Sequence, residues 1–461
     1  MSKFGVDASD RDFTAAYVIH VAFAGDDRQR TAAARLEEAI GLANAIDLSV
    51  RKAEIATVAN PRPATLIGAG KVEALRAALD AEQAPRPALV IIDAALTPVQ
   101  HRNLEKELDA KVLDRTALIL EIFGERARTA EGRLQVDLAH LTYQKSRLVR
   151  SWTHLERQRG GRGFLGGPGE RQIESDRRAI ENQIDKLRER LDQVRRTRTL
   201  QREKRKKAPH PVVALVGYTN AGKSTLFNRM AKSDVVARDQ LFATLDPAMR
   251  AVDLPSGQRI ILSDTVGFIS DLPTQLVAAF RATLEEVNEA DLILHVRDAA
   301  HEDSDAQRND VINVLAQLGV DATDNRPVIE VLNKIDLLPQ DDRFAALAAS
   351  RAVRADAPMT IEEPARMAIS AVSGEGIDLL CDLIDAVLTV DRVTYAVAIG
   401  AGEGAPIAWL HSHGDVKSEA ELNGQVSMTV RLSEKTAGQF RKQFPNLPLE
   451  IHRAHSGRLI A

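Results

Sequence analysis

The chain of 461 residues lacks several features that mark other classes of protein. Its single cysteine, Cys381, excludes an internal disulfide, and the apolar residues around it predict a buried, unreactive thiol. No apolar run approaches the roughly 20 residues that a transmembrane helix needs. The start of the chain lacks the basic-then-apolar order of a signal peptide. These absences predict a cytoplasmic protein without stable membrane insertion.

The chain also lacks an excess of either charge, with 61 basic residues, 65 acidic residues and a formal net charge of −4. This balance argues against a uniformly basic nucleic-acid-binding protein, but it leaves a local basic patch open. The length is sufficient for about three domains. Function must therefore be sought in the motifs.

The most informative motif is a glycine-rich segment between an apolar strand and a helical pattern. It has the spacing G-x-x-x-x-G-K-S and reads Gly217, Tyr218, Thr219, Asn220, Ala221, Gly222, Lys223, Ser224 and Thr225. The two glycines allow the backbone to turn so that successive N–H groups face a phosphate at a helix N-terminus. Lys223 would add a positive charge at the β- and γ-phosphates, and the Ser224 hydroxyl would bind Mg²⁺. The alternative is a plain strand-to-helix turn, which the agreement of spacing, lysine and hydroxyl disfavours.

A second motif predicts which base is bound. Asn333, Lys334, Ile335 and Asp336 follow the apolar run 328–332, so they lie at the carboxyl end of a strand, where open α/β sheets bind ligands. A carboxylate there accepts hydrogen bonds from N1–H and the exocyclic amine of guanine, whereas adenine offers no matching pair of donors. Alone, N-K-x-D is a weak match that is usually a surface turn. After a phosphate loop it favours GTP and GDP as ligands.

Three further segments complete the predicted site. One, D-x-x-G after an apolar strand, supplies a carboxylate near Mg²⁺ and a glycine N–H for the γ-phosphate. A segment before it supplies a threonine that closes on Mg²⁺ in the triphosphate state, and a later strand end completes the guanine pocket. In chain order the residues are Phe242, Ala243, Thr244, Leu245 and Asp246, then Asp264, Thr265, Val266 and Gly267, then Ser370, Ala371 and Val372. The predicted catalytic residues are Lys223, Thr244 and Gly267, and the predicted Mg²⁺ ligands are Ser224 and Thr244.

These motifs in this order resemble a translation-factor-type P-loop GTPase, and other segments resemble one family, the bacterial ribosome-associated GTPase HflX. Those segments are 65–71, 114–120, 158–161, 166–170 and 176–178. The resemblance extends from about residue 30 to about residue 390 and departs from the family at Arg171, where threonine is more usual. It implies a GTP-hydrolysing switch that binds the large ribosomal subunit and its rRNA, and that acts in ribosome splitting, recycling or rescue under stress.

The pattern of the chain predicts an α/β protein with four parts. Residues 1–125 form an N-terminal α/β domain, 126–207 a helical hairpin with a glycine-rich loop, 208–390 the GTPase domain and 391–461 a small C-terminal α+β module. Residues 1 to about 30 are interpreted as a partly ordered lead with polar ends and one short apolar stretch. Narrow apolar stripes at heptad-like spacing favour the hairpin over helices that only face a domain core. The free protein is expected to be monomeric.

Basic residues of the hairpin form the predicted RNA-binding surface, which consists of Arg159, Arg162, Phe164, Arg171, Arg195, Arg196 and Arg198. Glycines interspersed with arginines and one aromatic ring suit close approach to a nucleic-acid backbone. The arginine run in the second helix has few compensating acids, which favours a polyanionic partner. A flexible loop and a solvated helix face are the alternatives. The composition permits RNA contact, and rRNA as the specific target is implied by the family resemblance.

A second phosphate loop is suggested by Gly68, Gly70 and Lys71, but Thr65 and Val72 stand where the motif requires a glycine and a hydroxyl residue. A strand-to-helix turn is therefore the favoured interpretation. An RNA-stimulated ATPase that works through the N-terminal domain is the alternative function.

Control of hydrolysis is the last feature. Ras-like switches place a glutamine after D-x-x-G to orient the attacking water, whereas this chain has Phe268 there. We therefore expect slow hydrolysis by the isolated protein and stimulation by a partner. Potassium-dependent GTPases that the chain resembles place an asparagine at the position of Asn220 to bind a monovalent cation, which makes K⁺ a second candidate cofactor beside Mg²⁺. A bracing role for Asn220 within the loop is the alternative.

Overall fold

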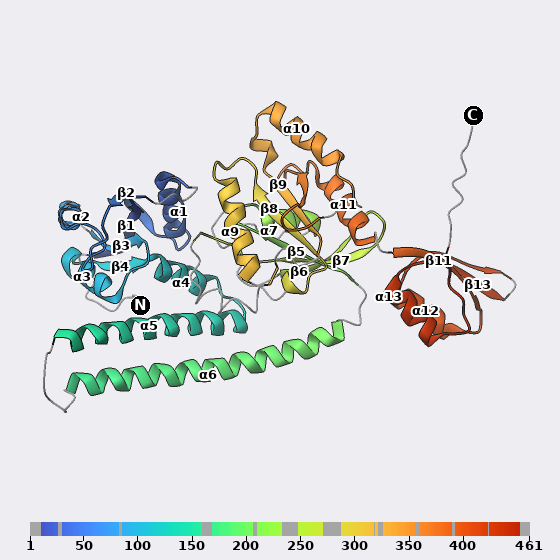
Figure 1. The fold of residues 1–461 in the computed structure, drawn as a ribbon, viewed down its shortest axis with the longest axis horizontal. Coiled ribbons are helices and arrows are strands. Elements are labelled where there is room, and N and C mark those ends of the chain that lie inside the picture. The colour runs from blue at the N-terminus through green and yellow to red at the C-terminus, as the bar shows by residue number, and fades with distance from the viewer. Residues whose placement is uncertain are drawn as a thin grey trace.

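The computed structural model describes residues 11–25, 30–82, 85–158, 168–205, 210–232, 248–270, 287–317, 319–320, 326–355, 357, 359–389, 392–422 and 424–451. These residues form an N-terminal α/β domain, a long helical hairpin, a second α/β domain and a C-terminal α+β module (Figure 1). The predicted fold class is confirmed. Within the described part of the chain, no helix is long and apolar enough to cross a membrane.

The N-terminal domain contains a four-stranded sheet in which all neighbouring strands are parallel and the order is β2-β1-β3-β4. Buried side chains of α1 and α4 pack on one face of this sheet, and those of α2 and α3 pack on the other. The elements are β1 (Arg11–Phe23), α1 (Ala32–Asn44), β2 (Ser49–Val58), α2 (Ala69–Ala81), β3 (Arg86–Asp93), α3 (Pro98–Leu108), β4 (Lys111–Asp114) and α4 (Arg115–Arg126).

The short apolar stretch expected within residues 1–30 lies in strand β1, so this part of the chain belongs to the sheet rather than to a lead. Strand β1 is a central strand of the sheet, and its residues from Ala15 to Val21 are buried. One of them, His20, obscures the apolar pattern, and its Nδ1 lies 2.7 Å from Oδ2 of Asp93 in the sheet interior. A buried polar group that has a hydrogen-bond partner costs little, so the strand tolerates it.

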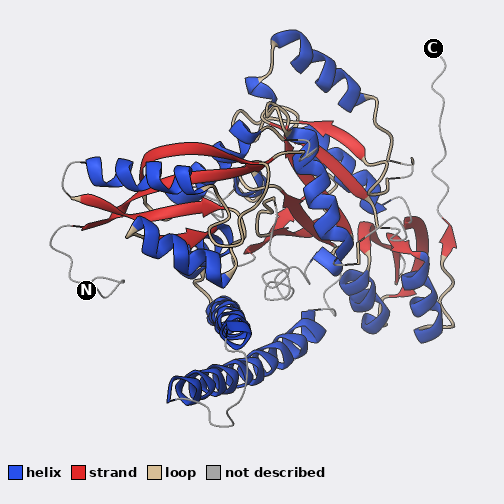
Figure 2. Cartoon of the chain, turned by 60° about the vertical axis from the view of Figure 1, so that its left-hand side comes forward, coloured by secondary structure: helices blue, strands red, loops and turns tan. Residues whose placement is uncertain are grey.

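The predicted helical hairpin is confirmed as α5 (Ala130–Gln158) and α6 (Pro168–Arg205). The ion pair between Lys145 and Glu181, at 3.0 Å, joins positions equally far from the turn, so the helices are antiparallel. Figures 1 and 2 show the two helices side by side, beneath the N-terminal domain in Figure 1. The Tyr143 hydroxyl donates to Oδ1 of Asp114 at 2.7 Å, which anchors α5 to the end of β4.

The second α/β domain has a six-stranded sheet of order β10-β9-β8-β5-β7-β6, in which only the edge strand β6 is antiparallel. The chain passes from β5 to β6 and β7 on one side of β5 and then crosses to β8 on its other side, so the carboxyl end of β5 is a topological switch point, where such sheets bind ligands. The elements are β5 (Val212–Gly217), α7 (Lys223–Met230), β6 (Ala248–Asp253), β7 (Arg259–Asp264), β8 (Leu292–Asp298), α9 (Ser304–Gln317), β9 (Val328–Asn333), the 3₁₀ helix η1 (Ile335–Leu337), α10 (Gln340–Arg351), β10 (Ala365–Ala368) and α11 (Ile377–Thr389).

The C-terminal module is an antiparallel sheet of order β12-β13-β11-β14 that packs with two helices around its own apolar core. Its elements are β11 (Arg392–Gly400), α12 (Gly404–His413), β12 (Asp415–Leu422), β13 (Gln425–Ser433), α13 (Glu434–Gln443) and β14 (Glu450–Ile451). Cys381, in the preceding helix α11, is half-buried, and burial raises the pKa of its thiol to about 11, in keeping with a thiol of low reactivity.

Candidate nucleotide site

The glycine-rich segment forms a tight loop between β5 and α7. Gly217 and Gly222 both have positive φ angles, 151° and 91°. A Cβ atom would lie 2.1 Å from the Val296 carbonyl oxygen at Gly217 and 2.1 Å from Nδ2 of Asn333 at Gly222. Both positions therefore require glycine, because any side chain would clash with a neighbouring strand end. Helix α7 begins at Lys223, directly after this loop, so its first N–H groups lie at a helix N-terminus, which is a favourable place for a phosphate.

Asn333 holds two loops of the site together. Its Nδ2 donates to the Ala221 carbonyl at 2.8 Å, and its Oδ1 accepts from the Ala371 backbone N–H at 2.9 Å. The predicted guanine-binding segments therefore meet beside the phosphate loop. Asp336 lies exposed in η1, and Nζ of Lys334 pairs with Oδ2 of Asp298 at 2.7 Å.

The guanine pocket would be closed by the loop after β10. Ser370 and Ala371 are buried there, and Val372 is exposed. Ser370 accepts from the backbone N–H of Ser373 at 3.1 Å, so the loop is internally braced. The backbone of this loop is thus held beside the Asn333 side chain.

The oxygen atoms that could hold Mg²⁺ come from the first helix turn and the end of β7. The Ser224 hydroxyl donates to Oδ2 of Asp264 at 2.8 Å. Thr265 fixes this strand end, because its hydroxyl donates to the Leu215 carbonyl at 2.6 Å. Hydroxyl and carboxylate oxygens are the hard ligands that Mg²⁺ prefers, so the residues present fit this ion.

Lys223 is buried within the loop that precedes it. Its ammonium group donates to the carbonyl oxygens of Gly217 at 3.0 Å and Tyr218 at 2.7 Å. Burial lowers the pKa of Lys223 to about 8, although the negative charge of Asp264 opposes this shift. An ammonium group has three N–H donors, so one remains for a phosphate oxygen.

The D-x-x-G segment is bonded to the phosphate loop. The Phe268 N–H donates to the Gly217 carbonyl at 3.1 Å, and the Thr219 N–H donates to the Phe268 carbonyl at 2.8 Å. Gly267 lies against Thr219 so closely that a Cβ atom on it would be 2.8 Å from the Thr219 methyl group. The same Cβ atom would lie 3.1 Å from Nζ of Lys223, so Gly267 also lies beside the Lys223 ammonium group.

A buried polar network joins this site to the N-terminal domain. The Tyr218 hydroxyl donates to Oε2 of Glu38 at 2.7 Å and accepts from the Ser270 N–H at 2.7 Å and from Arg30 at 2.9 Å. The Ser270 hydroxyl donates to Oε1 of Glu38 at 3.0 Å. Arg115, at the start of α4, donates to Glu38 and to the Ser270 carbonyl. Burial, together with the Glu38 carboxylate, raises the pKa of Tyr218.

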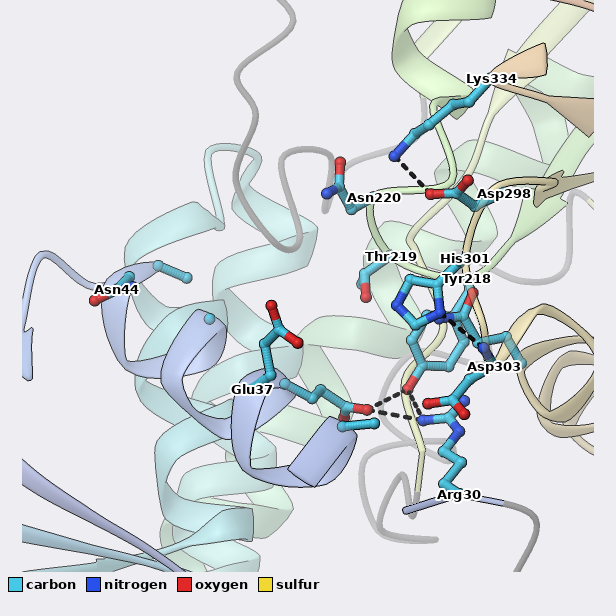
Figure 3. A pocket seen from close by; sticks show the side chains of 15 residues that line it. Arg30, Glu37, Asn44, Tyr218, Thr219, Asn220, Asp298, His301, Asp303 and Lys334 are labelled. Atoms are coloured by element: carbon cyan, nitrogen blue, oxygen red, sulfur yellow. Dashed lines mark hydrogen bonds and ion pairs between the residues drawn. The ribbon is translucent and has the colours of Figure 1, made fainter. Parts of the chain in front are cut away.

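A cavity of about 610 Å³ lies between α1 and the phosphate loop. Figure 3 shows Glu37 and Asn44 on the α1 side, Asn220 and Lys334 on the opposite side and His301 between β8 and α9. Asn220 has a φ angle of 60°, the left-handed conformation that asparagine adopts more readily than most residues. This conformation places its side chain at the rim of the cavity.

Four family models match successive parts of the chain. They are described as GTP-binding GTPase N-terminal over residues 33–124, GTP-binding GTPase middle region over 126–205, 50S ribosome-binding GTPase over 212–334 and HflX C-terminal domain over 359–453. GTPase HflX of Magnetococcus marinus is 45% identical over 416 residues, which are 90% of this chain and 92% of that protein. The chain belongs to the HflX family of GTPases.

A second curated relative agrees with this membership. GTPase HflX of Escherichia coli is 42% identical over 393 residues, 84% of this chain and 87% of that protein. A GTP-binding protein from the archaeon Sulfolobus solfataricus, solved in complex with GDP, is 23% identical, with a TM-score of 0.44, and the match covers 81% of this chain and 99% of that chain. As a member of the HflX family, the chain is a GTPase.

Several predicted residues of this HflX-family GTPase lie outside the described part of the structure. They are Phe242, Ala243, Thr244, Leu245 and Asp246 of the GTP site, and Arg159, Arg162 and Phe164 of the hairpin loop. Arg171, Arg195 and Arg198 belong to α6, but their side chains are not described. Arg196 is exposed on α6.

The structure also adds residues that the motifs did not indicate. Arg30, Glu38, Arg115 and Ser270 contact or support the phosphate loop although three of them belong to the N-terminal domain. No local signal marks them, because charged and polar side chains usually face solvent. The segment at Gly68 is the N-cap of α2 with a φ of −64°, and its Lys71 pairs with Glu54, which agrees with the strand-to-helix turn.

Proposed function

We propose that this HflX-family GTPase uses GTP hydrolysis to act on the large ribosomal subunit, in ribosome splitting, recycling or rescue under stress. The observation that carries the proposal is that the three nucleotide-binding motifs lie together at one end of the sheet. The phosphate loop follows β5, D-x-x-G follows β7 and N-K-x-D follows β9, all at one end of a single sheet. The matching family model is described as a 50S ribosome-binding GTPase, which supports the choice of partner.

The predicted nucleotide-binding residues have the following roles in this proposal. The loop from Gly217 to Thr225 holds the phosphates, and Lys223 stabilises the charge that develops between the β- and γ-phosphates. The Gly267 N–H contacts the γ-phosphate. Asp336 accepts from guanine, with Lys334 along the base and the loop Ser370–Val372 closing the pocket. Ser224 and Thr244 hold Mg²⁺, whose charge offsets that of the phosphates when it is bound.

A monovalent cation at Asn220 is a further part of the proposal. Asn220 is an exposed residue of the phosphate loop, and it lines the cavity (Figure 3). A K⁺ ion there would lie beside the phosphates, where it could offset developing negative charge. Turnover that is faster in K⁺ than in Na⁺ buffers, with the difference lost in Asn220→Ala, is expected. Equal rates in both buffers with large subunits present would rule out this cation.

Contact with rRNA is assigned to the hairpin. The exposed Arg196 lies on α6, a helix whose C-terminal part is rich in arginine and lysine. Such a run neutralises phosphates and releases their counterions on binding. The hairpin extends along one side of the molecule (Figures 1 and 2), so its helices can contact RNA at a distance from the GTP site.

The function is tested with intact ribosomes. Intact 70S ribosomes are incubated with the protein and GTP, and sedimentation through a sucrose gradient measures the fraction of free subunits. The proposal predicts an increase with GTP and none with GDP. Asp336→Asn is the matched control, because it should be inactive with GTP and active with xanthosine triphosphate. An unchanged subunit fraction together with no co-sedimentation with large subunits would contradict the proposal.

A further inference from the structure

The residue after D-x-x-G cannot orient the attacking water. The Phe268 side chain is 2% exposed and belongs to the apolar cluster that includes Tyr218 and Val266. Its backbone is bonded to the phosphate loop in both directions, through Gly217 and Thr219. These bonds fix the ring away from the reaction, so the hydrogen bond to water must come from another group.

Thr219 carries a hydroxyl group with unused hydrogen-bonding capacity at this place. The residue is 6% exposed, and its Oγ1 has no hydrogen-bond partner within the described part of the chain. A buried hydroxyl without a partner costs about 1–3 kcal/mol. Native proteins keep few such groups, and a catalytic role is one reason for keeping them.

The position of Thr219 is given by its contact with Gly267. A Cβ atom built on Gly267 would lie 2.8 Å from the Thr219 methyl carbon, 3.0 Å from its Cα and 3.1 Å from Nζ of Lys223. Thr219 therefore stands beside the ammonium group and the glycine N–H that hold the γ-phosphate in the proposed function. Rotation about the Cα–Cβ bond by one staggered step moves the hydroxyl to the position of the methyl and the methyl to the position of the hydrogen. The hydroxyl can thus reach the point that the methyl occupies.

We propose that the Thr219 hydroxyl orients the water that attacks GTP, in place of the glutamine that this chain lacks. The proposal rests on GTP hydrolysis at this site. The hydroxyl oxygen accepts a hydrogen bond from the water, whose oxygen then bonds to the γ-phosphorus. The bond from this phosphorus to the β–γ bridging oxygen breaks, and GDP leaves with the electron pair. The proton of the water passes to an oxygen of the released phosphate.

Two substitutions separate the hydroxyl from the methyl group. Thr219→Val keeps the shape and removes the hydroxyl, whereas Thr219→Ser keeps the hydroxyl and removes the methyl that contacts Gly267. Single-turnover hydrolysis with saturating large subunits measures the chemical step, and titration with a fluorescent GTP analogue measures affinity. Loss of a group that acts only in the transition state lowers the rate and leaves substrate affinity unchanged.

The valine variant is expected to lose about 10- to 100-fold in rate, as for loss of one hydrogen bond to a group that carries charge, with GTP affinity changed less than about twofold. The serine variant should keep the rate within about threefold. GDP affinity and melting temperature show that both variants fold.

Parental rate in the valine variant, or a larger loss in serine than in valine, would overturn the proposal and assign Thr219 to packing on Gly267. A parent protein without turnover in the same assay would instead refute hydrolysis at this site.

Discussion

The interdomain network around Glu38 gives a stability prediction that can be worked from the structure. Glu38→Ala removes the carboxylate that accepts from the Tyr218 and Ser270 hydroxyls and pairs with Arg30 and Arg115. The side chains of the two arginines are only 6% and 9% exposed. The substitution therefore leaves buried donors of both domains without their common acceptor.

Removal of one partner of a buried ion pair costs about 3–5 kcal/mol. Each arginine keeps a second carboxylate, Asp310 at 2.9 Å for Arg30 and Asp93 at 2.6 Å for Arg115. The lower end, about 3 kcal/mol, is therefore expected. For a cooperative unit of about 150–250 residues this loss corresponds to a fall of about 6–12 °C in melting temperature.

Differential scanning calorimetry of the full chain measures this fall. Glu37→Ala is the matched control. Glu37 directly precedes Glu38 in α1 and is exposed, and its replacement by alanine removes the same charge. A surface substitution of this kind should change stability by less than about 0.5 kcal/mol. Equal melting temperatures for the two variants would refute the inference that the network joins the domains.

Three further predictions concern the ligands. Asp336→Asn should weaken GTP binding by about 1–3 kcal/mol or more and favour xanthosine triphosphate, and an unchanged preference in a competition titration would remove Asp336 from base recognition. Because burial lowers the pKa of Lys223 to about 8 in the free protein, the ammonium form that phosphate favours is lost as pH rises above this value. GTP affinity should then fall about tenfold per pH unit. A fluorescence titration in which the GTP affinity of Lys223→Met falls equally steeply with pH would contradict this role of Lys223. Joint neutralisation of the basic run that ends the predicted hairpin should flatten the salt dependence of ribosome binding with GTP affinity unchanged, whereas the parental salt slope in a pelleting assay would make this run a solvated linker. The run consists of Arg195, Arg196, Arg198, Lys204, Arg205, Lys206 and Lys207.

The nucleotide site was predictable because its motifs are local and follow strands. Parallel strands bring their carboxyl ends to one edge, so the order of the motifs along the chain implied that they meet. The contact of Asn333 with both Ala221 and Ala371 shows this convergence. Helical periodicity likewise sufficed for the hairpin, whose two helices carry separate apolar stripes.

The contribution of the N-terminal domain could not be predicted in this way. Glu38 is separated from Tyr218 by 180 positions and from Ser270 by 232, and nothing near it in the sequence marks a buried acceptor. Its role depends on how two domains pack, which no local pattern encodes. Strand β1 was missed for a related reason, since His20 interrupts its apolar run and is compensated only by Asp93 of a distant strand.

The central claim is that GTP hydrolysis is slow in the free protein and is stimulated by the large ribosomal subunit. Steady-state phosphate release, with and without purified large subunits in one K⁺ and Mg²⁺ buffer, tests it most directly. The account predicts slow turnover alone, because Phe268 offers water no hydrogen bond and Thr219 presents its methyl group to Gly267 in the free protein. It predicts a marked increase with large subunits, and small subunits serve as the control. Fast turnover without subunits, or equal rates with and without them, would contradict the account.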